Sequence, residues 1–207
     1  MNSTMRPWLA TAGLVLVLAG CASPSQSTRF YRLDQPAPVA AMPAVTEEQD
    51  APPLVGIGAV ALAEYLDRPQ LVERGPEHRL TLHEFDHWAG GLRENILQVV
   101  RDELQRSLPR TRVIAYPWRG GVRPEYELEL SVNRLERQGE RVWLEARWSL
   151  FGEPGGRLLL LERSAIAIPV KGGGIDSVVT GSAEAVRALA REIAGRVTPI
   201  FLPLAGE

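Results

Sequence analysis

Apolar residues that recur at helical spacing predict two amphipathic helices in this chain. The first covers residues 92–108, where an apolar residue returns every four positions and forms one continuous stripe. Pro109 disfavours helical geometry in the residue before it, so we expect the helix to end there. The opposite face, which includes Asn95 and Glu103, is polar, and we expect it to face solvent.

The second helical pattern begins at Asp176 or Ser177, either of which can cap the first turn. It continues to about Thr198, and we expect Pro199 to stop it. Apolar residues at helical spacing form the expected inner face: Val179, Val186, Leu189, Ile193 and Val197.

Strict alternation of apolar and polar residues predicts three consecutive antiparallel strands over residues 125–168, with turns at Gly139 and at residues 152–156. In the first strand, apolar side chains point to one side and a row of glutamates points to the other. In the second strand, the expected core face consists of Val142, Leu144, Ala146, Trp148 and Leu150. These strands would form a meander with one buried and one polar face.

Shorter runs predict further strands at residues 29–33, 54–62, 79–82 and 112–116. Residues 54–62 are almost wholly apolar, which is typical of a central strand covered on both faces. Gly56 and Gly58 lack the third glycine of a dinucleotide-binding fingerprint, so they indicate close packing of the backbone. Residues 65–72 mix an aromatic residue, an ion pair and a proline, and we expect a turn-like connection there.

These elements predict a single α/β domain over residues 54–207. Its mixed β-sheet would contain the antiparallel three-strand meander and would be flanked by the two main amphipathic helices. With one cysteine in the whole chain, the domain has no internal disulfide. If residues 1–20 are removed, Arg6 is lost, and 22 basic residues then face 25 acidic residues for a net charge of -3. Such a balance does not suit a nucleic-acid partner.

The only cysteine, Cys21, follows a short apolar run. Arg6 precedes residues 8–19, which carry no charge and are too short to span a membrane as a helix. The string Leu18-Ala19-Gly20-Cys21 resembles the lipobox of bacterial lipoproteins. This resemblance implies that residues 1–20 are a removed signal peptide and that Cys21 carries a covalent lipid. Two or three acyl chains anchor a protein firmly, whereas one chain binds a membrane only marginally.

Residues 21–53 would then form a lipidated amino terminus with a short strand and a proline-rich linker over residues 34–53. We expect this linker to give the domain reach from the membrane. Ala22, rather than an aspartate, follows the cysteine. By resemblance to sorted Gram-negative lipoproteins, this implies the outer membrane, with the domain on its periplasmic face. No cofactor is expected beyond the lipid.

The string His83-Glu84-Phe85-Asp86-His87 matches the zincin motif H-E-x-x-H, in which two histidines one helical turn apart bind zinc and the glutamate activates water. The motif requires a helix, but the residues before it alternate as in a strand, and Gly90-Gly91 disfavour a helix after it. Glu103, the candidate third ligand, lies away from the apolar stripe of its helix. We therefore expect no metal site and no catalytic residues, and we keep a zinc-dependent hydrolase through His83, Glu84 and His87 as a third hypothesis.

Trp143 and Phe151 fall on the polar face of their predicted strand, on either side of Arg147. Aromatic residues and arginine are the usual anchors of protein interfaces. One interpretation is therefore that a partner protein binds this face. The other is that a helix covers it within a layered α/β arrangement.

Local strings spread over the mature chain carry a family resemblance. The resemblance starts at Phe30-Tyr31-Arg32-Leu33, and the matching strings are the strand around Gly56, Tyr65-Leu66-Asp67-Arg68-Pro69-Gln70, Trp88-Ala89, Tyr116-Pro117-Trp118 and Leu189-Ala190-Arg191-Glu192-Ile193-Ala194. Together with the order of the predicted elements, these strings resemble the PqiC/YmbA family of ABC-type transport auxiliary lipoproteins. The resemblance implies a non-enzymatic lipoprotein that works with a mammalian-cell-entry (MCE) domain protein and its inner-membrane partner. Its expected role is to dock this intermembrane lipid-transport bridge at the outer membrane.

The string from Tyr65 to Gln70 is the most specific of these matches, so Tyr65 and Arg68 join Trp143, Arg147 and Phe151 as candidate partner-binding residues. A symmetric ring of copies would suit a tubular partner, and a homo-oligomer is therefore one expected assembly. The alternative function is a lipoprotein that itself carries lipid, which predicts a large apolar cavity.

Overall fold

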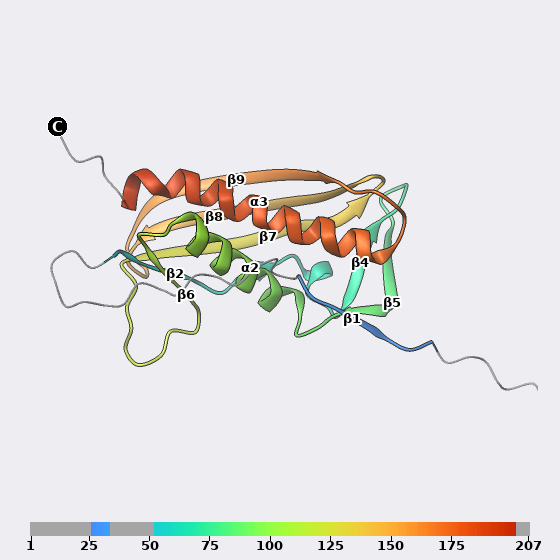
Figure 1. The fold of residues 1–207 in the computed structure, drawn as a ribbon, viewed down its shortest axis with the longest axis horizontal. Coiled ribbons are helices and arrows are strands. Elements are labelled where there is room, and N and C mark those ends of the chain that lie inside the picture. The colour runs from blue at the N-terminus through green and yellow to red at the C-terminus, as the bar shows by residue number, and fades with distance from the viewer. Residues whose placement is uncertain (1–25, 34–51, 202–207) are drawn as a thin grey trace, which may run out of the picture.

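The computed structural model describes residues 26–33 and 52–201, and Figure 1 shows their arrangement. The predicted signal peptide, Cys21 and most of the proline-rich linker lie outside these residues. The elements in chain order are β1 (Arg29–Tyr31), β2 (Leu54–Ile57), β3 (Ala61–Leu62), the 3₁₀ helix η2 (Glu64–Leu66), β4 (Gln70–Arg74), β5 (Leu80–Trp88), α2 (Leu92–Ser107), β6 (Arg112–Ala115), β7 (Tyr126–Gln138), β8 (Arg141–Gly152), β9 (Arg157–Pro169) and α3 (Ile175–Phe201).

Strand β7 organises the sheet, because other strands pair along both of its edges. On one edge, β2, β3 and β4 each pair in parallel with a successive part of β7. On the other edge, β8 pairs with β7 in antiparallel fashion over nearly its whole length. The nine-stranded sheet therefore has the order β1-β5-β4-β7-β2-β6, and it continues from β7 through β8 to β9. The predicted fold class is confirmed: a mixed sheet with an antiparallel meander and two main helices.

The meander β7–β9 buries the predicted face. The five core positions predicted in β8 are all buried, and the indole N–H of Trp148 donates a hydrogen bond of 3.1 Å to Oγ of Ser164. A register shift between Val132 and Arg134 then exchanges the two faces of β7. After it, Leu135 continues the buried row, while Glu136 lies directly opposite Trp143 on the other face.

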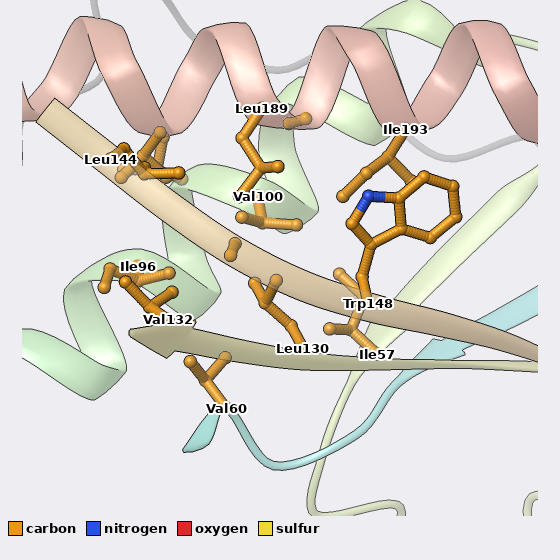
Figure 2. Close-up of a cluster of buried hydrophobic side chains, with 14 of the residues drawn as sticks. Ile57, Val60, Ile96, Val100, Leu130, Val132, Leu144, Trp148, Leu189 and Ile193 are labelled. Carbon is orange, nitrogen blue, oxygen red and sulfur yellow. The ribbon is translucent and has the colours of Figure 1, made fainter. Parts of the chain in front are cut away.

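Helices α2 and α3 pack against one face of the sheet and against each other (Figure 1). Figure 2 shows Val100 of α2, and Leu189 and Ile193 of α3, reaching the same core as Trp148 of β8. All four side chains are fully buried, and each buried methylene stabilises the fold by about 0.8 kcal/mol. Gly181 lets α3 approach β8 closely, because a Cβ atom there would lie 2.7 Å from Val142.

The prediction that Asn95 and Glu103 face solvent is wrong, because α2 is covered on more than one side. Asn95 accepts the backbone N–H of Leu33 at 3.0 Å and donates to the carbonyl of Ala89 at 2.8 Å. Glu103 accepts a hydrogen bond from Arg191 of α3 at 3.4 Å. Asn95 is buried at a contact with the segment after β1, and Glu103 is buried at a contact with α3. Both side chains are hydrogen-bonded, as buried polar groups normally are, and both lie outside the apolar stripe that predicted the helix.

Three element boundaries also differ from the predictions. Residues 65–72 do not form one turn-like connection, since they contain the end of η2 and the start of β4, with Leu66 and Leu71 buried. Residues 54–62 divide into β2 and β3, although β2 is central as predicted, between β7 and β6. Pro199 does not stop α3, which continues to Phe201. Pro199 has no N–H to bond the carbonyl of Gly195, but only two residues of the helix follow it, so little of the helix is disturbed.

Strand β1 belongs to the same sheet as the rest of the domain. It pairs in parallel with β5, and Arg29 forms two hydrogen bonds with Asp86, of 2.7 and 3.0 Å. The proline-rich segment therefore connects β1 to β2 within one sheet and does not separate Cys21 from the domain. Only residues 22–28 lie between Cys21 and β1 in the sequence. No helix among the described residues is long and apolar enough to cross a membrane.

Candidate functional site

The outward-pointing side chains of β7, β8 and β9 form a sheet face that neither α2 nor α3 covers. We call it the outer face. The alternating burial along β8 places every fully buried side chain on the side of the helices. Arg147 is exposed on the other side, and Trp143 and Phe151 are partly exposed there. Of the two interpretations of these residues, cover by one of the two main helices is therefore wrong.

A groove of about 650 Å³ runs along the outer face where β7 and β8 lie beside the loop that follows β6. We call it the outer groove. Its floor is formed by Glu127, Glu129 and Ser131 of β7. Tyr116 and Trp118 form one wall, whereas the other is formed by Arg147 and Leu161.

The aromatic wall depends on a glycine in β2. A Cβ atom at Gly56 would lie 2.6 Å from the ring of Trp118 and 2.7 Å from Pro124, so only glycine leaves room for the indole. The structure thereby confirms that Gly56 serves close packing. The rings of Tyr116 and Trp118 meet edge to face, with centroids 5.8 Å apart. Within the described residues the buried Nε1 atom of Trp118 has no hydrogen-bond partner.

The floor of the groove is acidic. Burial, together with the negative charge of Glu129, raises the pKa of the Glu127 carboxyl above its ordinary value. A carboxylate that is held partly away from water beside a second carboxylate favours the approach of a positive charge. This part of the groove therefore suits a basic side chain.

The neighbouring part of the outer face is basic. Arg147 and Arg163 lie directly opposite each other on β8 and β9, and both are exposed. Like charges directly opposite in a sheet are destabilising. Neither arginine forms an ion pair within the part of the chain that the structure describes. These two guanidinium groups are available to carboxylates of another molecule.

Apolar side chains border these charges. Leu158 and Leu161 of β9 are 48% and 66% exposed, and Leu158 lies opposite Phe151 of β8. Strand β9 pairs only with β8, so its other edge is open in the described structure. The outer face thus combines aromatic and aliphatic groups with two unpaired arginines, which is the composition of a protein interface.

The structure divides the predicted partner-binding residues between two places. Arg147 and Phe151 lie at the outer groove or next to it, whereas Trp143 lies at the other end of β8. There the guanidinium of Arg134 stacks over the Trp143 ring at 5.3 Å, and Arg134 also donates to Glu136 at 3.0 Å.

Tyr65 lies with Arg134, Glu136 and Trp143 at this other end of β8. Its hydroxyl donates to Glu136 at 2.5 Å, and Nε of Arg74 contacts the same carboxylate at 2.5 Å. Burial, and next the hydrogen bond to Glu136, raise the pKa of Tyr65 above its ordinary value. Tyr65 is thus a structural contact between η2 and β7. Arg68 is half-buried, its Nε atom has no hydrogen-bond partner in the described residues, and it lines neither place.

The H-E-x-x-H string lies in a strand, as its flanking residues indicated. It belongs to β5, in which His83 pairs with Leu71 and His87 pairs with Gln70. The residues between them bulge out of the ladder, so the two histidines do not lie one helical turn apart. His83 lies 3.6 Å from Glu73. Among the described residues no three histidine, cysteine, aspartate or glutamate side chains are grouped as metal ligands.

Sequence reasoning identified Arg147 but missed the aromatic wall of the outer groove, Leu161 in the other wall, and Arg163 beside it. Tyr116 and Trp118 were noted as part of a local string, and Arg163 was not singled out. Alternation along β9 indicates that Arg163 points outward, but its position opposite Arg147 requires the register of β8 and β9. The position of the aromatic wall depends on the pairing of β2 with β6 and with β7. Strand β2 lies far from both of them in the sequence.

Comparisons with known proteins agree with this fold. The profile of the family described as ABC-type transport auxiliary lipoprotein component matches residues 31–194. A crystal structure of an uncharacterised protein is similar with a TM-score of 0.68 at 19% identity, over 83% of this chain and 99% of that chain. A protein from Xanthomonas campestris is similar with a TM-score of 0.62 at 18% identity, over 84% of this chain and 96% of that chain. No curated protein matches the sequence.

Proposed function

Because the chain belongs to the family of ABC-type transport auxiliary lipoprotein components, we propose that it docks an MCE-domain protein of an intermembrane lipid-transport system through its outer face. In this proposal the lipid on Cys21 holds the protein at the outer membrane, with the domain in the periplasm. The protein acts by binding and has no catalytic step. The MCE-domain protein and its inner-membrane partner form the bridge that it positions.

The observation that carries this proposal is the uncovered outer face. An antiparallel sheet can leave one face in water, but such a face is then normally lined by well-solvated polar residues. Here the face presents Leu161 and the aromatic wall beside Arg147 and Arg163. Aromatic and arginine side chains of this kind carry most of the binding energy in protein interfaces. The outer face therefore favours a protein partner.

The charges of the groove favour docking over the alternative function, the carriage of lipid. A site for acyl chains is lined predominantly by apolar side chains. The floor of the outer groove instead carries Glu127 and Glu129, and desolvation of a carboxylate by an acyl chain would cost several kcal/mol, as an order of magnitude. An adjoining pair of acidic and basic patches suits a partner segment with the complementary charges.

A symmetric ring of copies is compatible with this arrangement, and we keep a homo-oligomer as part of the proposal. The open edge of β9 offers one surface on which either a second copy or the MCE-domain protein can add a strand. The docking surface for the bridge is the outer groove with Arg147 and Arg163.

Affinity capture from crosslinked cells tests the proposal. The tagged lipoprotein should recover an MCE-domain protein, identified by mass spectrometry, and the double variant Arg147→Glu/Arg163→Glu should lose it. Arg110→Glu is the matched control, since Arg110 is an exposed arginine just after α2 and lies outside the outer face. Recovery of lipid alone by the wild-type protein, without an MCE-domain protein, would contradict docking and support the carrier. Equal recovery by the double variant would exclude this surface.

A further inference from the structure

The first strand of the domain carries an exposed aromatic ring close to the predicted lipid anchor. Phe30 of β1 is 67% exposed, and it follows Cys21 by nine residues. Nine residues span at most about 30 Å when fully extended, and a flexible chain of that length has a root-mean-square span of about 15–18 Å. A lipid on Cys21 would therefore hold Phe30 close to the membrane surface.

The orientation of Phe30 is fixed by the sheet. The two hydrogen bonds between Arg29 and Asp86 hold β1 on β5, and Leu33 is buried just after the strand. The Phe30 ring meets His87, its partner in β5, edge to face, with centroids 5.9 Å apart. The exposure of this ring is thus a property of the folded domain, because the backbone on both sides of it is held in place.

A second phenylalanine is exposed in the neighbouring strand. Between Leu71 and Gln70 the register of β4 and β5 shifts, and this leaves Glu84, Phe85 and Asp86 without partners in β4. Phe85 is 43% exposed within this bulge. Phe30 lies opposite His87, two residues from Phe85 along β5, and we call these two exposed phenylalanines of paired strands the β1–β5 patch. Arg32, which follows β1, is exposed and has no ion-pair partner among the described residues.

We infer that the β1–β5 patch contacts the phospholipid membrane to which Cys21 is anchored, with Phe30 and Phe85 at the boundary between headgroups and acyl chains. Aromatic rings lie favourably at this boundary, and a nearby arginine is attracted to lipid phosphates. The short tether makes this contact intramolecular, so a weak interaction suffices to orient the domain. The inference rests on the proposed lipidation of Cys21.

This contact would also decide which surface a partner can reach. In the sheet, β1 and β5 lie at one side, and β8 and β9 lie beyond β7 at the other. With the β1–β5 patch on the membrane, β8 and β9 would lie on the far side of β7 from the strands that contact the membrane. The contact would thus leave the open edge of β9 accessible to a bridge protein that arrives from the inner membrane.

The test uses the mature lipoprotein in vesicles of phosphatidylethanolamine and phosphatidylglycerol. Cys21 is the only natural cysteine, so once it is acylated a cysteine introduced by Phe30→Cys or Phe85→Cys is the sole free thiol for an environment-sensitive fluorophore. Leu161→Cys is the matched control, because Leu161 is 66% exposed against 67% for Phe30. We expect a blue shift, and a loss of fluorescence with quencher-labelled lipids, at residues 30 and 85 and neither change at residue 161.

A further variant separates membrane contact from simple proximity. With the fluorophore at residue 85, Phe30→Ser should reduce quenching by the labelled lipids if the side chains hold the patch on the membrane. Quenching that is unchanged by Phe30→Ser, or that is no stronger at residues 30 and 85 than at residue 161, would overturn the inference and leave the proposed docking function intact. Mass spectrometry of the amino-terminal peptide distinguishes the other failure, since a peptide without lipid would contradict the lipoprotein itself.

Discussion

At the scale of single residues, Glu136 is a buried carboxylate that three side chains from different parts of the chain contact. Its side chain is fully buried, yet its carboxylate receives hydrogen bonds from Tyr65, Arg74 and Arg134. A buried carboxylate is tolerated only when its charge is compensated by such partners. This single residue thereby joins η2 and β4 to the end of β7.

Replacement of Glu136 by alanine should therefore destabilise the domain strongly. Removal of one member of a buried ion pair costs about 3–5 kcal/mol, because the remaining charges stay buried without a partner. Urea unfolding followed by circular dichroism measures this difference in the free energy of unfolding. Glu140→Ala, at an exposed position in the next turn, should change it by less than about 0.5 kcal/mol. A loss at Glu136 as small as that at Glu140 would show that the cluster is not structural.

Replacement of Glu127 is expected to stabilise the domain, in contrast to replacement of Glu136. Burial and the charge of Glu129 raise its pKa in the folded protein, so the folded state binds this proton more tightly than the unfolded state does. The resulting stabilisation is present at low pH and is lost as the pH rises from about 4.3, the ordinary glutamate value, through the raised pKa. Glu127→Gln, which cannot ionise, should be more stable than the wild type at pH 7, by less than about 1 kcal/mol because the site is only partly buried.

Unfolding measurements between pH 3 and pH 8 test this expectation. The advantage of Glu127→Gln should grow over the lower part of this range and then level off. A variant that is less stable than the wild type at pH 7 would mean that the Glu127 carboxylate is compensated by contacts in the fold, and the acidic floor would then not be poised for a partner.

At the scale of elements, local sequence patterns predict where helices and strands form. Tertiary contacts determine which polar residues are buried and where a strand is divided. The stripe of α2 and the alternation of β7, β8 and β9 were visible because each depends on a period of a few residues. Burial of Asn95 and Glu103 was not visible, since their partners Leu33 and Arg191 lie on distant segments. The division of residues 54–62 likewise follows from the successive pairing of β2 and β3 with β7.

The candidate site shows the same division. Alternation along β8 sufficed to place Arg147 and Phe151 on the outer face, but it did not distinguish them from Trp143, which Arg134 covers after the register shift in β7. Tyr65 was selected from a family string, whereas its contact with Glu136 gives it a structural role. The aromatic wall belongs to a loop whose position depends on three strands, so no local pattern indicated it.

The packing of β2 against this loop yields a further prediction. Gly56→Ala places a Cβ atom where Trp118 and Pro124 now lie, so the indole must move away from the groove. Overpacking of this kind costs about 1–3 kcal/mol. Gly173→Ala is the control, since a Cβ atom there meets nothing within 4 Å. Urea unfolding should separate the two variants, and capture of the partner should fall only for Gly56→Ala. Equal stability of the two variants would show that the Trp118 wall adapts freely.

At the scale of the whole molecule, a single sheet carries the face that the helices cover, the outer face, and the side at which β1 lies. Helices α2 and α3 cover one face and pack into the core, whereas neither helix covers the outer face (Figure 1). The strand nearest the predicted lipid anchor lies at the side of the sheet opposite β9. The chain belongs to the family described as ABC-type transport auxiliary lipoprotein component, and the separation of β1 from the outer face agrees with our proposal of an anchored domain that docks a partner elsewhere.

Site-specific photocrosslinking in intact cells tests most directly whether the outer face binds an MCE-domain protein. A photoreactive amino acid at residue 161, in the wall of the outer groove, should crosslink to that protein. The same group at residue 79, whose arginine side chain is 74% exposed at the turn before β5, should not. Crosslinks to the MCE-domain protein from residue 79 but not from residue 161, or from neither position, would contradict the claim.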